Sequence, residues 1–340
     1  MMWLRMAVCA VGALSAAWAC TAKALDYREL AVIVNTWDPL SVQIGEYYAA
    51  RRHINFQNYI KVGFRPGQKT MTSEDFVKLQ SWVAEQTRPN VQAYALTWAL
   101  PYRVGCMSIT TAFAMGYSPD FCEPGCKPTR SSPYFKSAAR EPFTRFGIRP
   151  TMSIAAYTFD QAKELIDRGV ESDGSRPQGT AYLLSTTDSA RNVRSASYPE
   201  VEKALRGKLA ISVLRKNVLL DAKDVLFYFT GLSRVDGLGT LRFLPGAVAD
   251  HLTSFGGEMT DDSGQMSALR WLEAGATGSY GTVSEPCAFP GKFPDVPVLL
   301  SAYLKGETLI EAYWKSVAMP GQGIFIGEPL AAPFSASAVQ

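Results

Sequence analysis

The sequence predicts an α/β protein in which a mainly parallel sheet lies between two layers of helices. Short apolar segments with β-branched residues alternate along the chain with longer segments of helical spacing, which is typical of βα units. Residues 224–230 are apolar without alternation, as expected of a strand buried on both faces. Cysteine, proline, glycine and arginine gather in residues 103–150, where we expect an irregular insertion that carries disulfides.

The N-terminal α/β part is predicted to span residues 25–102. Its strands are expected at 30–35, 58–64 and 91–100, because these segments are apolar and end at polar or proline positions. One helix is expected at 39–52, with Pro39 near its start, where a missing N–H costs nothing. A second helix is expected to begin at Thr72.

The C-terminal α/β part is predicted to span residues 151–340 and to continue the same alternation. Strands are expected at 179–185, 224–230, 244–250, 275–280 and 323–326. Helices are expected at 159–170, 198–205, 265–274, 299–305 and 308–317. No internal repeat interrupts this pattern.

Composition excludes two classes of protein. The 340 residues are 47% hydrophobic and 19% charged, with a formal net charge of +3, which excludes a disordered chain. So small a charge over this length gives no strong field, so we expect no nucleic-acid partner bound through bulk charge. His53 and His251 are the only two histidines that any histidine-based chemistry could use.

Residues 1–24 are predicted to be a secretory signal peptide. Arg5 precedes an apolar run at residues 6–18, and small residues at 22 and 24 precede a cleavage point before Leu25. The run is too short to span a membrane. A lipoprotein modified at Cys20 is the weaker alternative, because the preceding residues match its motif poorly. We expect a secreted or periplasmic bacterial protein with no transmembrane span after cleavage.

Four cysteines remain after that cleavage: Cys106, Cys122, Cys126 and Cys287. In an oxidising compartment they are expected to form two disulfides, with three possible connectivities. Cys122 and Cys126 are close enough to bond to each other, and either can instead reach Cys106. Cys287 is then a partner or a free thiol. No histidine lies near them, so we expect no metal site, and no cofactor is indicated.

Several motifs after residue 224 resemble those of a known peptidase fold. They are Gly275-Ala276, Gly278-Ser279, the helix signal Gly306-Glu-Thr308-Leu-Ile-Glu311-Ala312 and the turn Gly327-Glu-Pro329. In this order they resemble the C-terminal part of the caspase-like cysteine peptidases, particularly the gingipain type. The resemblance implies a three-layer sandwich with a catalytic His after one strand and a catalytic Cys after the next. The chain as a whole resembles an uncharacterised family of secreted bacterial proteins.

The sequence departs from the peptidase pattern at both catalytic positions. Leu232 stands where the His is expected, and residues 251–254 (His-Leu-Thr-Ser) replace the Cys. A shifted dyad is one hypothesis: His251 would activate Cys287, with Asp250 or Glu285 orienting the imidazole. The alternative is that His251 is structural and Cys287 is in a disulfide.

Other residues are candidates for substrate binding because they follow the carboxyl ends of predicted strands, where sites form in parallel sheets. They are Ser254, Gly256, Gly257, Ser279, Tyr280 and Asp38. Gly256 and Gly257, together with Gly281, would offer N–H groups to an oxyanion, and the simpler interpretation of Asp38 is a helix N-cap.

The leading functional hypothesis is a secreted peptidase- or amidase-like protein without the standard dyad, repurposed through His251 and Cys287 as a cysteine hydrolase. The alternative is a non-catalytic binding or assembly protein of the periplasm or cell surface. The expected partner is a peptide or a cell-envelope component. A metal-dependent hydrolase using Asp38, Asp250 and His251 is a weaker third hypothesis.

Overall fold

The computed structural model describes residues 24–122, 126–260 and 264–336. A large sheet contains β1 (Leu30–Asn35), β2 (Tyr59–Val62), β4 (Ala93–Leu96), β7 (Thr151–Ser153), β8 (Thr180–Ser185), β9 (Ala210–Arg215), β10 (Val225–Thr230), β11 (Phe243–His251), β12 (Gly278–Thr282) and β13 (Gly323–Gly327). A three-stranded sheet contains β3 (Thr70–Met71), β5 (Arg103–Val104) and β6 (Met107–Ser108). The predicted signal peptide lies outside the described residues, apart from Ala24.

The large sheet has ten strands in the order β2-β1-β4-β7-β13-β12-β11-β10-β8-β9. The strands β2, β1, β4 and β7 are parallel to one another, as are β9, β8, β10, β11 and β12. β13 is antiparallel to β12 and joins the two groups through one bridge to β7. β2 and β9 are therefore the two edge strands.

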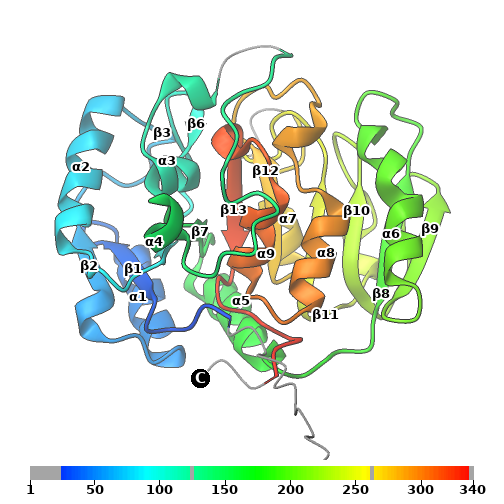
Figure 1. Cartoon of the computed structure of the whole chain (residues 1–340), viewed down its shortest axis with the longest axis horizontal. Coiled ribbons are helices and arrows are strands. Elements are labelled where there is room, and N and C mark those ends of the chain that lie inside the picture. The colour runs from blue at the N-terminus through cyan, green and yellow to red at the C-terminus, as the bar shows by residue number, and fades with distance from the viewer. Residues whose placement is uncertain (1–23, 123–125, 261–263, 337–340) are drawn as a thin grey trace, which may run out of the picture.

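Helices cover both faces of this sheet (Figure 1). They are α1 (Pro39–Arg51), α2 (Ser73–Gln86), α3 (Ile109–Met115), α4 (Pro142–Phe146), α5 (Phe159–Ser172), α6 (Tyr198–Leu205), α7 (Leu269–Glu273), α8 (Val296–Leu304) and α9 (Leu309–Ser316). α3, α9, α8 and α6 lie on one face, whereas α1 and α5 pack together on the other. This arrangement confirms the predicted three-layer α/β sandwich with a mainly parallel sheet.

Most of these helices begin at a residue whose side chain caps the first turn. Asp38 accepts the backbone N–H of Leu40 over 3.0 Å, so it caps α1 as the simpler interpretation predicted. α5 and α9 each begin with a capping box, formed by Thr158 with Gln161 and by Thr308 with Glu311.

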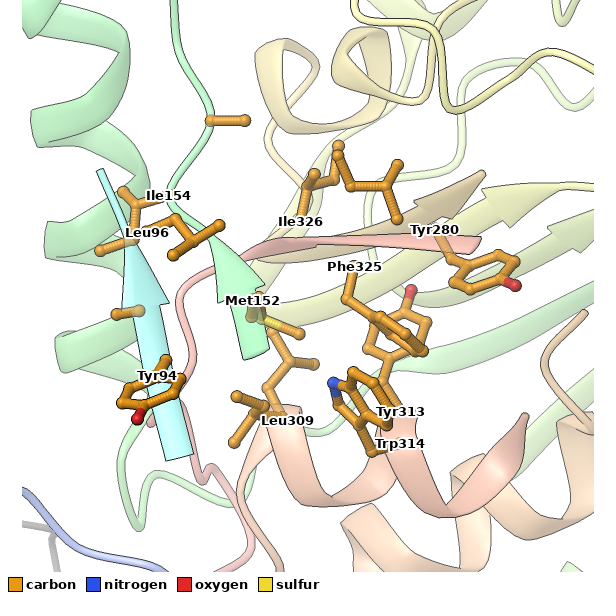
Figure 2. Close-up of a cluster of buried hydrophobic side chains, with 14 of the residues drawn as sticks. Tyr94, Leu96, Met152, Ile154, Tyr280, Leu309, Tyr313, Trp314, Phe325 and Ile326 are labelled. Carbon is orange, nitrogen blue, oxygen red and sulfur yellow. The ribbon is translucent and has the colours of Figure 1, made fainter. Parts of the chain in front are cut away.

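The core is continuous across β13, where aromatic rings from several elements meet (Figure 2). Trp314 of α9 stacks on Phe325 with ring centroids 4.5 Å apart, and Tyr280 lies 5.1 Å from the same ring. The indole of Trp314 donates to the carbonyl of Thr151 over 3.0 Å. These contacts join the two groups of parallel strands into one core.

The insertion at 103–150 is more regular than the composition suggested. It contains β5, β6, α3 and α4, and α3 packs against β13 and β7. The apolar residues of α3 are buried, including Ile109 and Phe113. The sequence also failed to indicate β9 and β7, because β9 is half exposed without clean alternation and β7 is only 3 residues long. Among the described residues, no helix is long and apolar enough to cross a membrane.

Candidate binding site

His251 ends β11 and is buried. Its Nδ1 accepts the indole N–H of Trp271 over 2.9 Å, and its Nε2 lies 3.0 Å from the carbonyl oxygen of Met266. Because Nδ1 accepts, the proton must be on Nε2, which donates to Met266. Burial lowers the pKa of His251 to about 3. The imidazole is therefore neutral, and both of its ring nitrogens form hydrogen bonds within the fold.

Cys287 is bonded to Cys126, with the two Cα atoms 4.9 Å apart. Cys106 and Cys122 form the second disulfide. The prediction of two disulfides is thus confirmed, and the pairing places Cys287 in one of them. The proposed His251–Cys287 dyad is wrong, because neither side chain has a free atom for the chemistry.

Asp250 does not orient His251 either. Its carboxylate pairs with Arg194 over 2.5 Å, and both side chains are buried. Arg194 also donates to the carbonyl of Thr230 over 2.9 Å, so it fastens the segment before α6 to the ends of β10 and β11. No sequence motif indicated this role of Arg194. The signal was an Asp inside a buried apolar strand, which requires a cationic partner.

Glu285 and Ser254 bond to each other. Oε1 of Glu285 accepts the Ser254 hydroxyl over 3.1 Å and the backbone N–H of Cys287 over 2.6 Å. The glutamate thus shapes the loop that carries the disulfide. It does not contact His251, so it is not placed to orient that imidazole.

The glycines proposed for an oxyanion hole serve close backbone packing. A Cβ on Gly281 would lie 2.3 Å from the carbonyl carbon of Gly256, and one on Gly257 would lie 2.6 Å from the carbonyl oxygen of Gly281. The N–H of Gly257 donates to the carbonyl of Thr282 over 2.9 Å. The Gly257 N–H is therefore already occupied within the fold.

Ser279 and Tyr280 of β12 are also buried. The Tyr280 hydroxyl donates to the carbonyl of Lys292 over 2.6 Å. Asp38 caps α1, so the predicted metal set of Asp38, Asp250 and His251 does not form. Within residues 24–122, 126–260 and 264–336, no group of three His, Cys, Asp or Glu side chains is placed to hold a metal ion.

A cleft lies at the other end of the sheet, between edge strand β2 and helix α2, and we call it the β2–α2 cleft. Its volume is about 910 Å³. The indole, amide and charged residues that line it are Trp37, Lys61, Arg65, Gln68, Asp75, Lys78 and Trp82. Trp37 follows the carboxyl end of β1, which is where sites form in parallel sheets.

Two exposed indoles stand at this cleft. The side chain of Trp37 is 65% exposed and that of Trp82 is 49% exposed. Trp82 donates its N–H to the carbonyl of Lys61 over 3.1 Å, which holds the ring across the outer edge of β2. Trp37 lies against Gly63, where a Cβ would come within 2.8 Å of the indole nitrogen. Both rings therefore lie beside the backbone of β2 and the loop after it, and that of Trp82 is hydrogen-bonded there.

Three cations without partners accompany the indoles. Among the described residues, the side chains of Lys61, Arg65 and Lys78 form no ion pair. Asp75 is the one acid that lines the cleft, and its carboxylate accepts the Thr72 hydroxyl over 2.9 Å. The cleft therefore carries an excess of positive charge. The sequence does not indicate this cleft, because the residues that line it are spread over residues 36–101 and form no motif.

No protein-family model matches this chain, and no curated protein matches it. The fold is similar to that of the complex of the pro- and mature domains of RgpB from Porphyromonas gingivalis, with a TM-score of 0.45 at 10% identity over 92% of this chain and 80% of that one. It is similar to the Arg-specific cysteine proteinase gingipain R, with a TM-score of 0.47 at 10% identity over 92% and 79%. A third structure, of a protease, gives 0.49 at 10% identity over 90% and 78%.

These likenesses concern the path of the chain, and they assign no role to any residue described above. The predicted membership of a family of secreted bacterial proteins stays a prediction.

Proposed function

We propose that this protein is a non-catalytic binding protein that holds an acidic saccharide in the β2–α2 cleft. The observation that carries the proposal is the meeting of two exposed indoles, Trp37 and Trp82, with three unpaired cations around one open cleft. Following the sequence, we place the protein in the periplasm or at the cell surface, where such polymers occur.

Stacking of a sugar ring on each indole would explain why two tryptophans are exposed at this cleft. A pyranose ring presents a face of C–H groups, and the electron-rich face of an indole attracts it. Exposed apolar side chains that gather at one cleft and are rimmed by polar residues are typical of a ligand-binding groove. Trp37 and Trp82 provide such faces at one cleft, and the hydrogen bond from Trp82 to the carbonyl of Lys61 orders that ring and so reduces the entropy lost on binding.

Charge accounts for Lys61, Arg65 and Lys78. Carboxylate groups on the saccharide would pair with these side chains, while the amide of Gln68, which has no partner among the described residues, would bond to hydroxyl groups. Single-stranded nucleic acid also combines stacking with cations. Net charge does not separate the two ligands, because both are anionic; we favour the saccharide because the cleft also offers the Gln68 amide to hydroxyl groups.

We infer that the protein is non-catalytic because the candidate catalytic side chains already form bonds within the fold. His251 uses both ring nitrogens in the fold, Cys287 is in a disulfide, and Asp250 is paired with Arg194. A peptidase-like fold without an available nucleophile or base at these strand ends is consistent with a protein that binds.

Calorimetric titration of the purified protein tests the proposal. The probes are oligomers of galacturonate, guluronate and glucuronate, each compared with its methyl-esterified form, which keeps the ring and removes the charge. We expect binding of at least one acidic probe, at least tenfold weaker binding of its ester, and weakening by salt. Trp37→Ala and Lys61→Gln should each weaken binding by about fivefold or more, as expected for loss of about 1 kcal/mol.

The matched control is Leu220→Ala, which removes an exposed apolar side chain far along the chain from the cleft. It should leave binding unchanged. Failure of every acidic probe to bind would contradict the proposal, as would equal binding of an acid and its ester. Tighter binding of oligothymidylate than of every acidic oligosaccharide would show that the ligand is a single-stranded nucleic acid and would contradict the proposal.

A further inference from the structure

The first residues after the predicted cleavage point are buried against helix α9. Leu25 is 2% exposed and Asp26 is 6% exposed. The backbone nitrogen of Leu25 lies 3.1 Å from Oε2 of Glu311 and donates to it. This contact joins residues that are 286 positions apart in the chain.

Glu311 is a buried carboxylate with neutral partners only. Glu311 is 2% exposed. Its Oε2 also accepts the backbone N–H and the hydroxyl of Thr308, over 2.9 and 2.7 Å. Within the described ranges no cation pairs with it, whereas Lys315 of the same helix pairs with Glu307 over 2.9 Å. A buried carboxylate is costly unless a cation compensates its charge.

The sequence supplies a cation at this point. Small residues at 22 and 24 predict cleavage of the Ala24–Leu25 bond. A signal peptidase adds one water across that bond, so that Ala24 leaves with the new carboxylate and Leu25 keeps its nitrogen as an α-ammonium group. The nitrogen that becomes charged is the atom already bonded to Glu311.

We propose that the mature chain begins at Leu25 and that its α-ammonium group forms a buried ion pair with Glu311. The pair ties the new N-terminus to the first turn of α9, which packs under β13 in the central core. Removal of the signal peptide thereby strengthens the fold, because the donor to the Glu311 carboxylate changes from an uncharged amide N–H to an ammonium group, which compensates the buried charge. This inference does not depend on what the β2–α2 cleft binds.

N-terminal sequencing of the exported full-length chain is the first test. We expect Leu25 as the first residue. A mature start at any other residue would overturn the proposal.

A thermodynamic cycle is the second test. It compares the exported mature protein with a form that retains Ala24 and carries an acetylated N-terminus, each with and without Glu311→Gln. Glutamine keeps the capping box, so α9 still forms, but it removes the charge. We expect Glu311→Gln to lower the melting temperature more in the mature form than in the acetylated form, by about 2 °C or more.

Glu307→Gln is the matched control, because Glu307 pairs with Lys315 in both forms. Its effect should be the same with either N-terminus. An equal effect of Glu311→Gln in the two forms would overturn the ion pair and leave only a hydrogen bond between the Leu25 nitrogen and Glu311.

Discussion

The indole N–H of Trp271 donates to Nδ1 of His251 over 2.9 Å and fixes the imidazole in the tautomer that carries its proton on Nε2. That proton in turn faces the carbonyl of Met266. A histidine held on both sides in this way cannot take a proton from a nucleophile without breaking a buried bond. The histidine that the sequence offered for catalysis is thus a structural link between β11 and α7.

His251 should remain neutral at physiological pH. Its pKa in the folded protein is about 3, below the ordinary 6.5, so the unfolded chain alone binds a proton there as the pH falls between these values. The group therefore stabilises the fold fully above pH 6.5 and loses this contribution at up to about 1.4 kcal/mol per pH unit below it. Imidazole NMR should show no titration of His251 between pH 5 and 8, with His53→Gln used for assignment. Titration of His251 near pH 6.5 would contradict this burial.

The two disulfides should leave no reactive thiol among Cys106, Cys122, Cys126 and Cys287. Alkylation of the oxidised protein, followed by peptide mapping, should label none of them before reduction. The Cys126–Cys287 bond closes a loop with a sequence separation of 161, so the double variant to serine should lose about 2–5 kcal/mol of unfolding free energy. Rapid labelling of Cys287 in the native protein would contradict the pairing.

Arg194 and Asp250 should depend on each other. Arg194→Met leaves a buried carboxylate without a cation and should cost about 3–5 kcal/mol in unfolding free energy. The double variant with Asp250→Leu should be more stable than either single variant, because it removes both buried charges. Denaturant unfolding measures all three. Additive losses in the double variant would show that the two groups are independent.

Gly281 should tolerate no side chain. Alanine would place its Cβ 2.3 Å from the backbone of Gly256, so the loop after β11 would have to move, and we expect a loss of about 2 kcal/mol or more. Gly239→Ala is the control, because nothing lies within 4 Å of a Cβ there and its φ is not positive. Equal stability of the two variants would show that the loops do not pack as described.

The sequence predicted the elements whose signals are local. α6 was predicted with its exact bounds, and β10 was indicated by its unbroken apolar run. The site could not be predicted in this way. Whether Cys287 is a thiol or half of a disulfide depends on Cys126, which lies 161 residues earlier, and the partner of Asp250 lies 56 residues earlier, at Arg194.

The β2–α2 cleft was missed for a related reason. Trp37 and Trp82 read as ordinary apolar residues of a loop and a helix, and only the packing of α2 beside the edge strand leaves them exposed at one place. No spacing rule connects them, because Trp37 follows β1 and Trp82 lies on α2, and only the fold brings these two segments together beside β2.

NMR of the indole N–H groups tests the central claim most directly. The protein has 7 tryptophans, so the signals are few enough to assign. On addition of the acidic oligosaccharide that binds, the signals of Trp37 and Trp82 should shift together, while that of Trp271, which is bonded to His251, should stay in place. A shift of Trp271 with Trp37 and Trp82 unchanged would place the ligand at the strand ends around His251 and contradict the account.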